Sequence, residues 1–110
     1  MTVESSSWVP GQTGMISLLM AFNCERPATE ICPTETYTFD LVTGSGSVYA
    51  RENNPAIPQP SFGSIINLPT YGGTMETGYV GFSITNLENS LFLRVGNTLE
   101  PGLAVYFALP

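Results

Sequence analysis

Carboxylates are the main candidates for acid–base chemistry in this chain, because the sequence contains no His. Two carboxylates can hydrolyse a glycoside when they flank the bond that breaks. The candidates for such a pair are Glu30, Glu35, Asp40, Glu52, Glu76, Glu88 and Glu100. Most of them lie in or beside predicted turns, and Glu35 and Asp40 would point to opposite faces of one strand. We therefore interpret them as solvated loop residues.

The absence of His also removes the commonest catalytic and metal-binding arrangements. Ser-His-Asp triads, Cys-His pairs and most zinc sites require an imidazole, so none of them can form within one chain. The acidic residues do not gather in a D-x-D type of loop that would suit calcium. The sequence therefore predicts a protein that is not an enzyme and that uses neither a metal ion nor another cofactor.

Cys24 and Cys32 are eight residues apart in a polar, proline-containing segment. We favour two reduced thiols, because synthesis in a cytosol disfavours disulfides. The main alternative is a disulfide formed after release into an oxidising medium, which would stabilise the fold by about 2.6 kcal/mol according to the loop-entropy relation. A metal site made by these two thiolates would need ligands from another chain.

The charge distribution excludes two classes of partner. The chain has three Lys and Arg residues in total and a net charge of −6, so it cannot present the basic face that binding to phosphates requires. The longest apolar run, residues 15–22, is interrupted by Ser17 and is too short for a membrane span. No Lys or Arg precedes this run, so we expect no signal peptide and synthesis in a cytosol. We predict neither nucleic acid nor membrane as a partner.

The 110 residues are enough for one hydrophobic core, and their pattern predicts an all-β domain. Residues 1–14 are rich in Ser, Gly and Thr and should form no regular element alone, so we interpret them as an extended N-terminal arm. Residues 15–110 then form the domain, a small antiparallel sandwich of about seven strands in which immunoglobulin-like, jelly-roll and small-barrel topologies all remain open. The predicted strands are 15–22, 36–42, 47–51, 63–68, 78–85, 90–95 and 103–109.

The predicted strands differ in how many of their faces are apolar. Phe39 and Leu41 alternate with Thr38 and Asp40, which indicates one buried face. The first and last strands are apolar on both faces and therefore need a cover. We favour a second subunit as that cover, and the alternative is that these are central strands covered by the chain's own loops. Buried association surfaces are poor in charge, as this chain is.

The segment 53–75 contains four prolines and no charged residue, so its first part should be an extended loop. It either docks on a partner or lies over an open end of the sandwich. Exposed aromatic rings would allow a different role, because sugar-binding sandwiches present such rings as platforms. The plausible exposed rings are Trp8, Tyr49, Tyr71 and Tyr79, although core or interface packing is the commoner use of aromatic residues.

The C-terminal third resembles a pattern found in small virion proteins of tailed bacteriophages. The resemblance rests on an I-T-N strand end, a strand of the form hydrophobic-x-hydrophobic-R-x-G, and a P-G turn before a final apolar strand. In this chain these are VGFSITN at 80–86, SLFLRVGN at 90–97, LEPG at 99–102 and LAVYF at 103–107. The resemblance implies a non-enzymatic capsid decoration, or cement, protein that binds the major capsid protein or another virion protein.

Further expectations follow from this resemblance. Such a protein would be made in the host cytoplasm and reside in the virion, and it would form a homo-oligomer, with a trimer favoured. Its arm would be anchored by Trp8, Val9 and Pro10. A second contact region would lie in the loop 53–71, with Pro58, Phe62 and Tyr71 as contact residues. The competing hypothesis is a carbohydrate- or host-surface-binding module of a tail or fibre.

Overall fold

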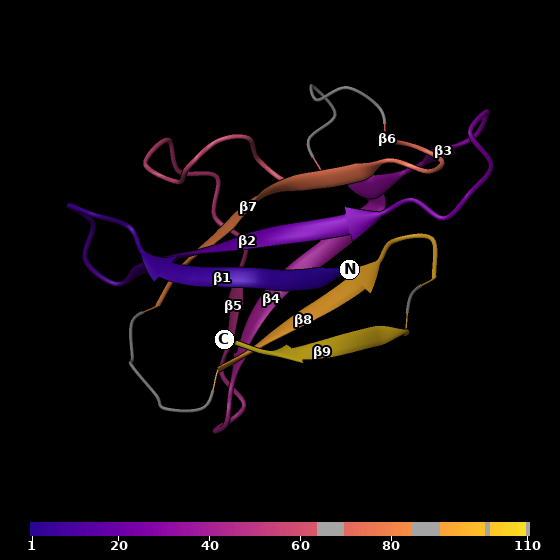
Figure 1. Ribbon diagram of the computed structural model, residues 1–110. Coiled ribbons are helices and arrows are strands. Elements are labelled where there is room, and N and C mark those ends of the chain that lie inside the picture. Colours follow the sequence, from indigo (N-terminus) through magenta and orange to yellow (C-terminus); the bar gives the residue numbers. More distant parts are fainter. Residues whose placement is uncertain (64–69, 85–90, 101, 110) are drawn as a thin grey trace.

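The computed structural model describes residues 1–63, 70–84, 91–100 and 102–109. These residues form an all-β protein, as the sequence predicts (Figure 1). The strands are β1 (Thr2–Trp8), β2 (Met15–Asn23), β3 (Ile31–Cys32), β4 (Tyr37–Thr43), β5 (Val48–Ala50), β6 (Thr70–Tyr71), β7 (Met75–Ser83), β8 (Leu91–Asn97) and β9 (Ala104–Ala108). One 3₁₀ turn, η1 (Thr34–Thr36), precedes β4. No helix in the described residues is long and apolar enough to cross a membrane.

Two larger sheets make up most of the structure, and their strands pair antiparallel. The first has the order β1-β2-β7, the second has the order β5-β4-β8-β9, and β3 and β6 form a small separate pair. The main core contains residues from both large sheets, which makes the arrangement a sandwich. Its buried residues are Ile16, Leu18, Met20, Phe39, Leu41, Phe62, Val80, Phe82, Ile84, Leu93 and Val95.

The alternation in the sequence places these core residues correctly. Phe39 and Leu41 are buried while Thr38 between them is exposed, and Val80 and Phe82 are buried on β7. The predicted strands at 15–22, 36–42, 47–51, 78–85, 90–95 and 103–109 correspond to β2, β4, β5, β7, β8 and β9. The predicted strand at 63–68 lies outside the described residues except for Gly63, which belongs to a turn.

The N-terminal segment is extended, as expected, but it is not a free arm. Residues 2–8 form β1, which pairs with β2 from Thr2 opposite Ala21 to Trp8 opposite Ile16. The backbone of a Ser-rich segment has the same hydrogen-bonding groups as any other, and β2 offers it a complete partner. The sequence also gave no indication of the two-residue strands β3 and β6.

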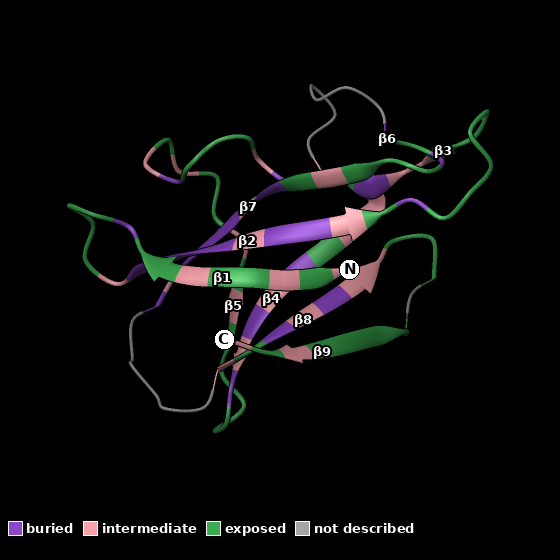
Figure 2. Cartoon of the chain, viewed as in Figure 1, coloured by how far each residue is buried: buried purple, intermediate pink, exposed green. Residues whose placement is uncertain are grey.

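Part of the apolar surface of β2 is covered within the chain. β2 is the central strand of its sheet, and most of its residues are buried (Figure 2). At the start of the strand, its outer face is covered by a second cluster in which Met15 is buried with Val9 and Ile57, and Ala56 and Tyr79 pack against them. For this part of β2 the cover comes from the same chain, and the second subunit that we favoured stays a prediction.

One side of the sandwich is closed by the segment 51–62. Glu52 forms a bridge with Gly81, and the amide N–H of Phe62 donates to the carbonyl of Tyr79 at 3.0 Å. Glycines on β7 permit this approach, because a Cβ at Gly78 would lie 2.7 Å from the nitrogen of Phe62. The opposite side is bordered by β1 and β9, which pair only with β2 and β8, respectively, within the described residues (Figure 1). The sandwich is therefore open along the β1 and β9 side.

Candidate functional site

The open side of the sandwich presents an apolar edge strand, β9. Val105 and Phe107 lie opposite Val95 and Leu93 of β8 and therefore on the core-facing side of the sheet, whereas Tyr106 lies opposite Arg94 on the outer side. The segment 102–109 has no charged residue. Leu103, Val105 and Tyr106 are 66%, 58% and 59% exposed, so β9 has apolar side chains in solvent on both faces (Figure 2).

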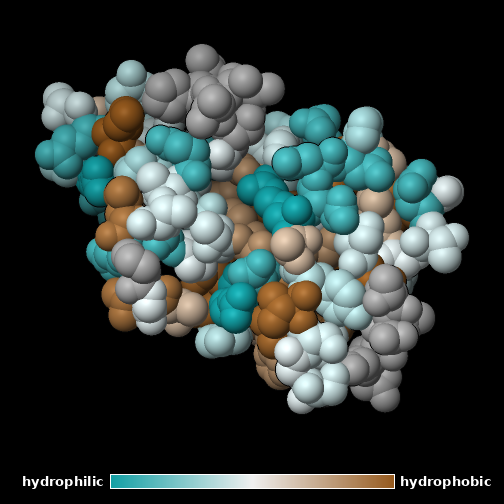
Figure 3. All heavy atoms as spheres, turned by 180° about the vertical axis from the view of Figure 1, so that it is seen from behind, coloured by the Kyte–Doolittle hydropathy of each residue, from teal (hydrophilic) through white to brown (hydrophobic). Residues whose placement is uncertain are grey.

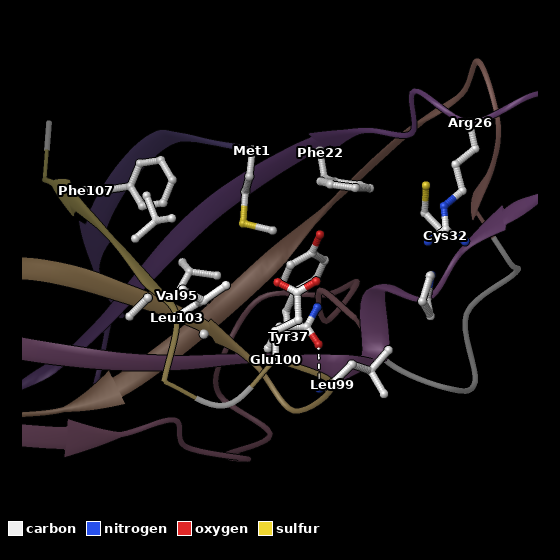
Figure 4. A pocket seen from close by; sticks show the side chains of 15 residues that line it. Met1, Phe22, Arg26, Cys32, Tyr37, Val95, Leu99, Glu100, Leu103 and Phe107 are labelled. Atoms are coloured by element: carbon white, nitrogen blue, oxygen red, sulfur yellow. Dashed lines mark hydrogen bonds between the residues drawn. The ribbon is translucent and has the colours of Figure 1, made fainter.

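A groove of about 740 Å³ lies between the sheets beside β9. Figure 4 shows Phe107, Met1 and Phe22 along one part of its lining and Val95, Leu103 and Tyr37 below them. The rings of Phe22 and Tyr37 are 5.6 Å apart and tilted by 58°. The groove lies at the edge of the main core, and most of the residues that line it are apolar.

Two charged residues contribute to the lining of the groove. Arg26 lies at one end, where its guanidinium donates to the carbonyl of Ile31 at 2.8 Å. Glu100, in the turn before β9, is exposed and lies nearer the middle of the lining (Figure 4). The side chain of Asn97 accepts a hydrogen bond from the amide N–H of Leu99, which orders this turn. These groups do not form an acid–base pair, and the groove is suited to holding apolar side chains.

The remaining edges of the two large sheets are protected from pairing with another chain. β1 carries an exposed Glu4, and its register shifts between Val3 and Ser5. The edge of β7 is covered through the bridges from Glu52 and Ser61, and β5 has only three residues. Charged side chains, bulges, covering loops and short length are the usual protections of sheet edges. Among the residues that the structure describes, Ala104–Ala108 has none of these protections.

Seen from behind, the molecule presents hydrophobic residues in separate patches among hydrophilic and neutral residues (Figure 3). The open side combines two features, an edge strand whose outer edge has no partner strand among the described residues and an adjoining apolar groove.

An ion pair lies on the outer face of the sheet beside β9. The guanidinium of Arg94 donates to Asp40 Oδ2 at 2.9 Å, and both side chains are partly exposed. The hydrogen bond to Asp40 raises the pKa of Arg94, and Tyr106 contributes in the same direction. Asp40 on β4 and Arg94 on β8 thus offset each other's charge in the row that ends at Tyr106 on β9.

Glu76, one of the carboxylates considered for catalysis, has a structural role. Its Oε1 accepts hydrogen bonds from the hydroxyls of Thr34 and Thr70 at 2.9 and 3.0 Å, and its Oε2 accepts one from the amide N–H of Gly63 at 3.0 Å. It therefore joins η1, β6 and the end of the loop 51–63 to β7. Both carboxylate oxygens are engaged by these donors, and Glu76 does not line the groove beside β9.

Arg51 is a second internal anchor of the same loop. Its guanidinium donates to the carbonyl of Phe62 at 2.6 Å and to Ser61 Oγ at 2.8 Å, and it lies over the ring of Phe39 at 5.3 Å. Burial lowers the pKa of Arg51, and the charge of Glu76 partly offsets this effect. Arg51 therefore fixes Phe62 in the core.

The structure brings together part of the predicted contact residues. Val9 packs with Ile57 in the second cluster, which places the neighbouring Pro10 and Pro58 at the same end of the sandwich. Trp8, Pro10 and Pro58 are exposed there. We call these three residues the end patch.

Two predicted contact residues are buried in the single chain. Phe62 is fully buried, with its ring edge-on to that of Phe39 at 5.6 Å, and Val9 is 4% exposed. Phe62 reaches the core because Gly78 leaves room for its backbone, and Val9 is buried by Met15 and Ile57. Neither side chain is available to a partner in this conformation.

The aromatic residues considered for sugar binding do not form one platform. Tyr49 and Tyr79 are half-buried. Trp8 and Tyr71 are exposed, but Trp8 ends β1 at one end of the sandwich and Tyr71 belongs to β6 at the other (Figure 1). Within the described residues, no three His, Cys, Asp or Glu side chains lie close enough to hold a metal ion.

Cys24 and Cys32 form a disulfide, with their Cα atoms 5.9 Å apart. This differs from the pair of thiols that we favoured from the sequence. The bond joins the end of β2 to β3, and Cys32 borders the groove. The disulfide therefore constrains the loop that forms one end of the groove.

No family model matches the chain, and no curated protein and no solved structure was found to match it. The assignment of a function therefore depends on the geometry of the chain itself.

Sequence reasoning found β9 but not the groove beside it. The apolar alternation of residues 103–109 on both faces was a sufficient signal for an unusual strand. The groove is lined by residues from both ends and the middle of the chain, such as Met1, Phe22, Tyr37 and Val95. No local pattern in the sequence connects these positions.

Proposed function

We propose that this protein is a non-enzymatic structural protein of a virion, of the capsid decoration type, which binds the outer surface of the capsid and stabilises the head. The observation that supports a protein-binding role is the edge of β9, with exposed Leu103, Val105 and Tyr106 beside an apolar groove. Soluble proteins avoid such an edge unless it meets another protein, because it is a template for strand pairing.

The architecture supports a binding role over a catalytic one. The groove has an apolar lining with few polar groups, and Glu76 and Asp40 are engaged in structural interactions. Binding by shape and strand pairing requires none of the missing imidazoles. The resemblance in the C-terminal third gives this general role its specific form, since its segments include β8 and the first four residues of β9.

The proposal assigns different surfaces to two kinds of contact. The end patch of Trp8, Pro10 and Pro58 is exposed and uncharged, and it is the proposed contact with the capsid. Tyr71 is exposed at the other end and is a further contact candidate. β9 serves the association of subunits. The disulfide between Cys24 and Cys32 is suited to a particle that leaves the reducing cytoplasm after assembly.

Quantitative mass spectrometry of purified particles tests this proposal. A decoration protein would be present in a copy number comparable to that of the major capsid protein. Only a few copies per particle would contradict the decoration role and favour the alternative, a host-surface- or carbohydrate-binding component of the tail. Absence from the particle would contradict the virion assignment itself. A variant with Trp8→Ala and Pro58→Ala should lose particle binding while the Glu4→Gln control retains it.

A further inference from the structure

The exposure of β9 changes along its length. On its core-facing side, Leu103 and Val105 are exposed, whereas Phe107 and Leu109 are half-buried and pack against the main core. The first half of this side, at Leu103 and Val105, is therefore exposed to solvent and borders the groove. The second half, at Phe107 and Leu109, is half-buried.

Two copies of β9 complement each other in this respect when they run antiparallel. In an antiparallel pair of two β9 strands centred on Tyr106, residue 103 faces residue 109 and residue 105 faces residue 107. The exposed Leu103 and Val105 would then lie beside the partner's Leu109 and the partner's Phe107. The exposed half of each strand would thus lie beside the half-buried half of the other strand. The large apolar side chains would lie on the same face of the joined sheet.

The outer side of the strand fits the same register. Ala104 would face the partner's Ala108, and the two Tyr106 residues would face each other across the twofold axis. Ala104 and Ala108 are small, so they leave room beside the Tyr106 rings when the two strands pair. The charges of Asp40 and Arg94 on the adjacent strands are paired with each other and add no repulsion between two copies.

Charge favours a copy of the same segment over a charged peptide. The chain has a net charge of −6, yet the segment 102–109 contains none of its charged residues. A basic or acidic strand would find no counter-charge along β9, whereas a second uncharged β9 meets no repulsion there. The unpaired backbone donors and acceptors of the edge are satisfied by any extended strand.

We propose that two copies of this protein associate through antiparallel pairing of their β9 strands, which joins the two four-stranded sheets into one. The inference rests on the protein-binding role of β9 in the proposed function. It does not depend on the capsid, so experiments on the isolated protein can fail or succeed independently of particle binding. It also predicts a twofold dimer, not the trimer that the resemblance implies.

Light scattering on the purified chain gives the first test. We expect a molar mass twice that of the 11.8 kDa chain at micromolar concentrations. Tyr106→Glu would place two carboxylates opposite each other across the axis, which opposes the pairing. Tyr106 is 59% exposed, so the substitution leaves the fold intact and this variant should be a folded monomer. Tyr71→Glu is the control, because Tyr71 is also exposed but lies on β6, and it should remain a dimer.

Cross-linking tests the register directly. Residues opposite each other in an antiparallel pair have Cα atoms about 4.5–5.5 Å apart, which is within the range for a disulfide. Tyr106→Cys should therefore give a covalent dimer on mild oxidation, and Tyr71→Cys should not. A wild-type monomer or trimer would overturn the proposal, and so would a dimer that neither Tyr106→Glu nor Tyr106→Cys affects.

Discussion

Val105 lies directly opposite Val95 on the ladder between β8 and β9, yet Val95 is 7% exposed and Val105 is 58% exposed. Both side chains face the interior of the sandwich, so at this point of the ladder the hydrophobic core ends between the two strands. Farther along, Phe107 still packs against the core, so only the first half of β9 extends beyond it. β9 therefore presents both a free backbone edge and an uncovered apolar face, and the proposed function follows from this combination.

Breaking the disulfide should destabilise the fold. The double variant Cys24→Ser with Cys32→Ser removes a short covalent loop, for which the loop-entropy relation gives a loss of about 2.6 kcal/mol in the free energy of unfolding. Urea denaturation followed by circular dichroism measures it. Reducing agent should lower the stability of the wild type by a similar amount and leave the double variant unchanged; an effect on both would place the cause elsewhere.

A side chain at Gly81 should disturb the loop that closes the sandwich. A Cβ there would collide with the buried side chain of Ile57, so Gly81→Ala should cost about 1–3 kcal/mol of stability. In the background of Ile57→Ala, the same substitution should cost clearly less, because the space is vacant. A double-mutant cycle measures the coupling. Equal costs in both backgrounds would contradict the close packing of Ile57 on β7.

Glu76→Gln should weaken the junction between β7 and its neighbouring segments. The amide group of Gln has one acceptor oxygen where the carboxylate has two, so one of the donors from Thr34, Thr70 and Gly63 loses its partner. Leaving a part-buried donor unsatisfied costs about 1–3 kcal/mol. Glu52→Gln, at an exposed carboxylate, is the matched control and should be close to neutral in thermal unfolding.

Asp40→Asn should have a small effect on stability. The ion pair with Arg94 is partly exposed, and pairs of this kind contribute about 0–1 kcal/mol. The loss should shrink further in high salt, which screens exposed charges. A salt-independent loss of several kcal/mol would show that the pair is more important to the fold than its exposure indicates.

The strands that could be predicted from the sequence are those in which apolar residues recur at every second position. The alternation of Phe39 and Leu41 with polar residues located β4 and its buried face, and the apolar pattern of residues 103–109 located β9. β1 lacks such a pattern, because its triple serine is compatible with a loop. Its strand conformation depends on pairing with β2, which no local signal records.

Other features could not be predicted because they depend on contacts between residues that are far apart in the sequence. Phe62 follows a proline-rich segment and reads as a loop residue, and it enters the core because Gly78 and Arg51 hold its backbone there. The spacing of Cys24 and Cys32 allowed either thiols or a disulfide, and the assumed redox compartment decided the prediction. The groove required Met1, Phe22 and Val105 to meet, which only the fold determines.

Amide hydrogen exchange, measured at several protein concentrations, tests whether β9 is an association edge. Exchange in a peptide covering residues 103–109 should slow as the concentration rises, while a peptide covering residues 2–8 of β1, the other edge on the open side, should keep its rate. An exchange rate in 103–109 that does not depend on concentration, or equal slowing in β1, would contradict this role of β9.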